Sequence, residues 1–88
     1  MDIIDLSDAY AYYEEYYPQD INYREAGKMV SDILMEHEDY KSNKDYETIC
    51  SLFESVEDML EFDTTMGMLK DWAKSNCCEI FKGVRNGW

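Results

Sequence analysis

The sequence contains little that would interrupt a helix, since a single proline and four glycines occur among 88 residues. Strands and hairpins usually need such residues at their turns, so this scarcity argues against a β-rich fold. No run approaches the roughly 20 apolar residues of a membrane span. The N-terminal segment 1–5 also lacks the positive and apolar regions of a secretory signal. We therefore expect a helical protein of the cytoplasm.

Residues that build catalytic and metal sites are also scarce. A single histidine, His37, excludes two-histidine metal sites and leaves one candidate for a histidine-dependent triad. Three cysteines, Cys50, Cys77 and Cys78, are an odd number without framework spacing, which favours reduced thiols in a cytosol. Phosphate-cradling glycine loops and nucleophile elbows are missing. The sequence predicts no enzyme, no cofactor and no metal site.

The sequence is also poor in positive charge: it has 8 basic and 20 acidic residues, and its net charge is −12. Residues 1–23 hold six acids and no base, residues 24–63 hold twelve acids and four bases, and residues 64–88 hold two acids and four bases. Such a chain repels nucleic acid and anionic membranes and attracts basic proteins. Acidity also confers solubility without any partner, and this alternative stays open.

The apolar residues that are present follow a helical spacing. Eighty-eight residues suit one domain, 1–88, with one core. Ser7 is placed to cap a first helix, and Pro18 to stop it. The fold class we predict is all-α: a small antiparallel bundle of about four helices over residues 8–17, 22–40, 44–62 and 65–82.

The helix over 22–40 has the clearest signal, because Asn22 followed by Glu25 is a capping-box pattern. Its core stripe is Ala26, Met29, Val30, Ile33, Leu34 and His37. The helix over 44–62, capped by Ser42 or Asn43, has a core face of Tyr46, Ile49, Cys50, Phe53, Val56 and Leu60, widened by Leu52 and Met59. The helix over 65–82 is capped at 63–64 and stopped by Gly83, before a tail over 84–88. Its buried side is predicted to be Met66, Leu69, Ala73, Cys77 and Ile80, flanked by Trp72 and Phe81.

Two rows of carboxylates accompany these stripes. On the helix over 44–62, the acids at i, i+7, i+11 and i+14 share one side and span roughly 21 Å along the axis. They are Glu47, Glu54, Asp58 and Glu61. A similar row on the helix over 22–40 is Glu25, Asp32, Glu36 and Asp39. The rows resemble the charge rows of a nucleic-acid backbone, which predicts a partner-binding surface, although a solvated face remains the alternative.

Tyrosine is concentrated in the first predicted helix. Three tyrosines, Tyr12, Tyr13 and Tyr16, can face the bundle, whereas Tyr10 and Tyr17 lie seven residues apart on another side. Tyrosine is favoured at interfaces because it buries a large ring and keeps a polar tip. We predict that Tyr10 and Tyr17 contact a partner, and packing within the monomer is the alternative.

In composition the chain resembles the DNA-mimic inhibitors carried by phages and plasmids, which are small, acidic and rich in Asp, Glu and Tyr. That resemblance implies a phage anti-restriction or anti-CRISPR protein that binds a basic nucleic-acid-binding protein, and no motif assigns residue roles. We therefore expect an inhibitor that occupies the basic nucleic-acid-binding surface of a nuclease, a restriction or CRISPR effector, or a toxin, without binding nucleic acid or membrane itself. The alternatives are an immunity protein or antitoxin against a nuclease toxin, and an acidic adaptor subunit.

Overall fold

The structure is a computed structural model that describes residues 2–17 and 19–82. Over these residues the chain forms four helices and two short strands. In chain order they are β1 (Asp2–Asp5), α1 (Ser7–Tyr16), α2 (Tyr23–Met35), α3 (Lys44–Ser55), α4 (Met59–Ser75) and β2 (Cys78–Phe81). The prediction of a mostly helical chain with four helices is confirmed, and the all-α bundle holds only roughly, because both ends of the described chain form short strands that pair in a small parallel sheet.

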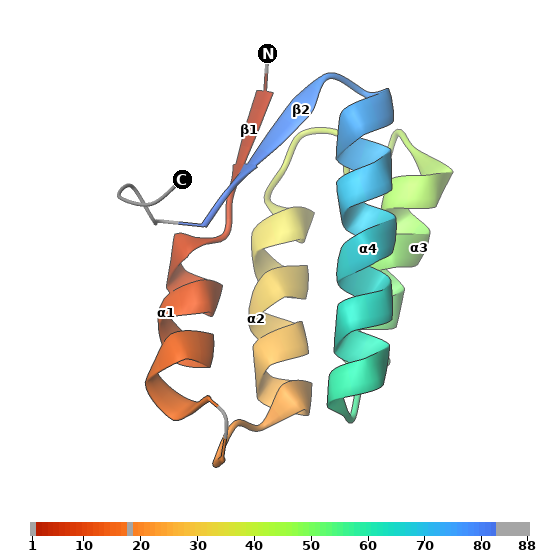
Figure 1. The fold of residues 1–88 in the computed structure, drawn as a ribbon. Helices are drawn as coiled ribbons and strands as arrows, with labels where there is room; N and C mark the ends of the chain where they lie inside the picture. Colours follow the sequence, from red (N-terminus) through yellow and green to blue (C-terminus); the bar gives the residue numbers. More distant parts are fainter. Residues whose placement is uncertain (1, 18, 83–88) are drawn as a thin grey trace.

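Consecutive helices run in alternating directions, and the two strands lie across the end of α2 at which that helix terminates (Figure 1). Helix α2 occupies the centre, with α1 on one side and α3 and α4 on the other. The closest helix pairing is that of α2 with α3, and α4 packs on α3 and on β2. This arrangement leaves much of α4 facing outward.

Strands β1 and β2 form a parallel two-stranded sheet that joins the two ends of the described chain. Ile4 pairs with Ile80 and Asp2 with Cys78 in the ladder. Alternate residues of a strand point to opposite faces, so Ile4 is buried against the helices while Ile3 is 59% exposed. Four-residue strands were not predicted because such short segments carry no period that distinguishes them from helix ends.

Helix α1 begins one residue earlier than predicted, at Ser7, so Ser7 is not its cap. The Asp5 carboxylate accepts a hydrogen bond from the Ser7 backbone N–H at 2.9 Å. Leu6 is fully buried, and its N–H donates to the Phe81 carbonyl at 2.7 Å, which extends the sheet to the start of the helix. The predicted stop at Pro18 lies outside the described residues.

Helix α2 confirms the capping prediction, because the Asn22 side chain accepts from the Glu25 N–H at 3.1 Å. The helix ends at Met35 rather than at residue 40, and residues 36–40 continue as turns in which the Tyr40 N–H donates to the His37 carbonyl. Helix α3 begins after Asn43, whose side chain accepts from two backbone N–H groups. Of the two caps proposed for α3, Asn43 is therefore the one used.

Gly27 sets how closely α2 and α3 approach each other. A Cβ atom at this position would overlap the Phe53 carbonyl oxygen and the Val56 side chain. Only glycine permits this backbone contact without displacing α3. The α2–α3 interface is consequently closed, with Val30, Leu34 and Phe53 fully buried.

The chain turns between α3 and α4, which overturns the predicted continuous helix over 44–62 and the predicted start of the next helix at 65. Helix α3 ends at Ser55, and Val56 has extended backbone angles. Asp58 then caps α4: its carboxylate accepts from the Glu61 N–H at 2.9 Å, and the Glu61 carboxylate accepts from the Glu57 N–H at 2.8 Å. This reciprocal pattern is close to a capping box and offers the backbone a better-satisfied start than continued helix.

Helix α4 ends at Ser75 rather than at residue 82. The side chains after Ser75 therefore do not follow the helical spacing from which their burial was predicted. Cys77 has a positive φ of 57° and is exposed, whereas Cys78 is buried. The prediction of a buried Cys77 is wrong for this reason. The predicted stop at Gly83 and the tail 84–88 lie outside the described residues. Among the residues that are described, no helix combines the length and the apolar character needed to cross a membrane.

Candidate protein-binding surface

Exposed carboxylate is the dominant feature of the surface. Every acidic side chain whose burial the structure describes is exposed, except that of Asp39, which is half-buried. Between residues that the structure describes there is one ion pair, Arg24 with Glu57, and both of its side chains are more than half exposed. Such an exposed pair contributes only about 0–1 kcal/mol. The net charge of −12 is therefore presented to solvent with little local neutralisation.

The carboxylate row that was predicted on the helix over 44–62 is divided between α3 and α4. Glu47 and Glu54 lie on α3 and are both exposed, as their spacing of seven residues requires. Asp58 and Glu61 lie beyond the turn and satisfy backbone N–H groups at the start of α4. A continuous line of roughly 21 Å on one axis is thus excluded, and the last two acids have a structural role that the pattern did not indicate.

The second predicted row is shortened for the same kind of reason. Glu25 and Asp32 lie exposed on α2, and Glu36 is the residue that follows its last turn. Asp39 lies in the turns after the helix, where its backbone N–H donates to Nδ1 of His37 at 3.4 Å. The His37 ring packs beside Tyr46 at 5.6 Å between centroids, so this histidine lies in a packed setting.

A groove follows the contact between α3 and α4, and it contains two hollows that share Met68. The first, here called the leucine hollow, has a volume of about 450 Å³ and is lined by residues that include Leu52, Val56, Leu60 and Glu61. Half of the lining residues are apolar, and Glu61 is the acidic residue among them. We call both hollows together the α3/α4 groove.

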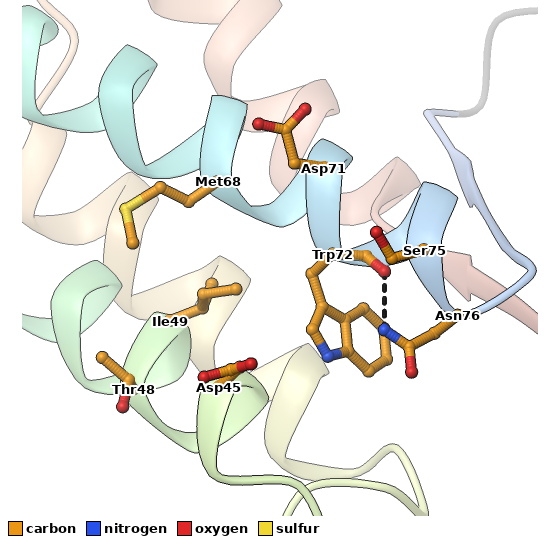
Figure 2. A pocket seen from close by; sticks show the side chains of 8 residues that line it. All are labelled: Asp45, Thr48, Ile49, Met68, Asp71, Trp72, Ser75 and Asn76. Atoms are coloured by element: carbon orange, nitrogen blue, oxygen red, sulfur yellow. Dashed lines mark hydrogen bonds between the residues drawn. The ribbon is translucent and has the colours of Figure 1, made fainter.

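The second, the tryptophan hollow, has a volume of about 360 Å³ and lies nearer the sheet end of α4. Figure 2 shows Asp45 on the α3 side of it and Asp71 on the α4 side, with the Trp72 ring reaching toward α3. The Trp72 carbonyl accepts a hydrogen bond from the Asn76 side chain at 2.8 Å. The indole Nε1–H lies on the ring edge toward Asp45 and, among the described residues, has no acceptor.

Large apolar side chains are exposed on α4, and two of them line this groove. Leu60 is 74% exposed and Met68 is 41% exposed. Met59 is 50% exposed and lies on the opposite side of α4 from Met68, nine residues along the helix. The exposure of Leu60 and Met59 was not predicted, because their spacing placed both residues in the core of a continuous helix over 44–62. The Asp58–Glu61 capping pattern was the signal that could have moved both residues onto a new helix with a different buried face, which includes Phe62.

The exposed tyrosine surface also differs from the predicted one. Tyr17 is exposed and stacks on Tyr13 at 5.0 Å between centroids, as an interface residue could. Tyr10 is half-buried against the core, and burial, followed by the Asp63 carboxylate, raises its pKa above the usual value. Tyr16 was expected to face the bundle, but its ring is exposed. The outward pair is therefore Tyr16 and Tyr17, and Tyr10 is the less accessible partner of the predicted pair.

One corner of the molecule is basic. Lys70, Lys74 and Lys82 line a hollow of about 380 Å³ between α4 and β2. The Lys82 ammonium lies 5.1 Å above the Tyr10 ring, and burial, followed by the neighbouring Lys70, lowers the Lys82 pKa. Between the described residues these lysines form no ion pair with the acidic surface. They therefore leave the carboxylates beside the α3/α4 groove uncompensated.

The comparisons with known proteins assign no role to these residues. No family model, no curated protein and no solved structure matches the chain. The class that the fold defines is a mostly helical protein closed by a small parallel sheet. Its candidate site is a protein-binding surface that combines exposed carboxylate with an apolar groove.

Proposed function

We propose that this protein is an inhibitor that binds a basic, nucleic-acid-binding partner protein and occupies the surface on which that partner holds nucleic acid. The single observation that supports this proposal is the exposure of nearly all the described carboxylates with one ion pair between described residues. A partner rich in lysine and arginine would supply the missing counter-charges. The partner class would be a nuclease, a restriction or CRISPR effector, or a toxin.

The charge determines how such a partner would be found. A field from twelve net negative charges attracts a basic surface over about 8 Å at physiological ionic strength, which accelerates association. Individual exposed ion pairs contribute little, so the carboxylates act as a set. The same field repels nucleic acid, which would then compete with this protein for the partner instead of binding to it.

Mimicry of nucleic acid does not require the single straight row that the sequence indicated. Glu47 and Glu54 remain in register on α3, and Asp32 is exposed on the neighbouring α2. None of these three carboxylates caps a helix in the described part of the chain, so their charge is available to a partner. The odd number of cysteines, without framework spacing, is typical of reduced thiols and supports a cytosolic setting for the proposed inhibitor.

The test begins with capture of partners from a nuclease-treated lysate of the source cells, at low and at high salt. A labelled nucleic acid bound to the captured protein is then challenged with wild type. We expect displacement at low salt and weaker displacement at high salt, because salt screens the attraction. If the captured protein keeps its nucleic acid while it binds this chain, the inhibitor proposal is wrong and an adaptor role replaces it. Capture of a toxin nuclease would instead indicate an immunity protein or antitoxin.

Two variants of equal net charge separate a specific surface from general acidity. The first changes Asp32→Asn, Glu47→Gln and Glu54→Gln, and the second changes Glu14, Glu15 and Asp20 to their amides. Neither set includes an acid that caps a helix. We expect the first variant to lose most of its competition and the second to keep most of it. Equal losses would show that net charge alone governs binding.

A further inference from the structure

We propose that the α3/α4 groove receives one amphipathic helix of the basic partner, a proposal that rests on the proposed function only in requiring a basic partner. The apolar side of that helix lies on Met68 and Leu60, and its lysine or arginine residues lie beside the carboxylates at the groove's edge. Helix-in-groove recognition of this kind uses apolar residues at positions i, i+3, i+4 and i+7 as anchors.

Two large apolar side chains are unusually exposed along the α3/α4 groove. Leu60 and Met68 both lie outward on α4, although single exposed apolar residues would need no explanation. Leu60 lines the hollow of about 450 Å³, and Met68 lines both this hollow and the one of about 360 Å³. Contiguous exposed apolar surface with a polar edge is typical of protein-interaction sites, and methionine suits such sites because its side chain adapts.

Charge decides which occupant the groove can take. Asp45 and Asp71 flank the tryptophan hollow and Glu61 edges the leucine hollow, and the described residues give none of them a cationic partner. A second copy of this chain would bring the same negative edge and a net charge of −12, so self-association is opposed. Nucleic acid is repelled for the same reason. A cationic segment remains as the occupant that matches both edges.

The length of the α3/α4 groove matches a partner helix of about four turns. From Leu60 to Ser75 the groove follows 16 residues of α4, whose ends lie roughly 22 Å apart at 1.5 Å per step. Gly67 stands beside Met68, and no atom lies within 4 Å of the place where its Cβ would be. A partner backbone can therefore approach α4 closely at this point.

The probe is a peptide of about 18 residues made of leucine, alanine and lysine, with leucine on one helical side, which is long enough to form a helix. A scrambled peptide of the same composition keeps the charge and loses the apolar side. Isothermal titration of the whole protein should give saturable 1:1 binding to the amphipathic peptide, at least about tenfold tighter than to the scrambled one. Equal affinities would overturn the groove proposal and leave the proposed function intact.

Variants locate the site. Leu60→Ser and Met68→Gln should each weaken binding of the amphipathic peptide by about tenfold, because each removes an apolar contact. Ile3→Ser is the matched control, since Ile3 is another exposed apolar residue but lies on β1. An equal loss in Ile3→Ser, or no loss in either groove variant, would overturn the proposal. If groove binding holds and the captured partner still keeps its nucleic acid, the proposed function is wrong while the groove remains a helix-binding site.

Discussion

Helix α3 packs against α2 and against α4, and side chains fill the interface with α2 more completely than the interface with α4. Toward α2 the contact is closed: Gly27 lets the backbones meet, and Phe53 is fully buried. Toward α4 the contact is open, with two hollows and with Leu60 and Met68 exposed beside them. One side of α3 therefore fixes the fold, and the other side has apolar surface left for another molecule.

The largest effect should come from filling the closed interface. Gly27→Ala places a methyl group against the Phe53 carbonyl oxygen and Val56, where the main chain cannot yield without moving α3. Overpacking of this kind costs about 1–3 kcal/mol. Urea denaturation should show a lower midpoint with little change in slope. An unchanged midpoint would mean that the α2–α3 contact is looser than described.

A second effect concerns the turn that separates the two helices of the open side. Asp58→Ala should lower the free energy of unfolding by about 1 kcal/mol, because the Glu61 N–H loses its cap. Asp63→Ala is the control, since the sequence pattern placed a cap at 63 and the structure places this residue inside α4. A larger loss in Asp63→Ala than in Asp58→Ala would restore the continuous helix over 44–62.

A third substitution sharpens the contrast between the two glycines. Gly67→Ala meets open space, so the gain in helix propensity should stabilise the protein by about 0.5–1 kcal/mol. The sign is opposite to that expected for Gly27→Ala, and thermal denaturation of both variants would measure it. Destabilisation by Gly67→Ala would show that the outward side of α4 is packed within the monomer.

The smallest expected change is in Leu60→Ser, which should alter the free energy of unfolding by no more than about 0.5 kcal/mol. Leu60 is 74% exposed, so its removal leaves no cavity. Chemical denaturation beside wild type gives the comparison. A loss of several kcal/mol would mean that Leu60 belongs to the core, as the helical spacing had suggested.

Helix α2 shows what the sequence predicts well. Its cap at Asn22 and its buried Ala26, Val30 and Leu34 follow from local hydrogen bonding and from a regular period, and both are confirmed. Its end at Met35 was missed because turns after a helix can keep the same apolar spacing. Local signals therefore predicted where this helix begins and which residues it buries, and they did not predict where it ends.

The α3–α4 corner and the sheet show where such signals fail. Apolar residues from Tyr46 to Leu60 fit one period, and only the Asp58–Glu61 pair marks the turn. Strands β1 and β2 are stabilised by pairing with each other, and that pairing depends on the whole intervening fold. The acidic character of the candidate surface follows from the sequence, and its role in binding stays a prediction. The groove could not be predicted, because the start of α4 was assigned to the same helix as α3.

The most direct test of the account asks whether the open side of α3 is the side that binds. Methionine methyl groups can be followed by NMR, and Met68 lines the groove while Met66 is buried and Met29 lies on α2. During titration with the amphipathic lysine-leucine peptide, we expect the Met68 signal to shift in proportion to binding and the Met29 and Met66 signals to stay nearly unchanged. Shifts spread evenly over these three methionines, or confined to Met29, would contradict the account.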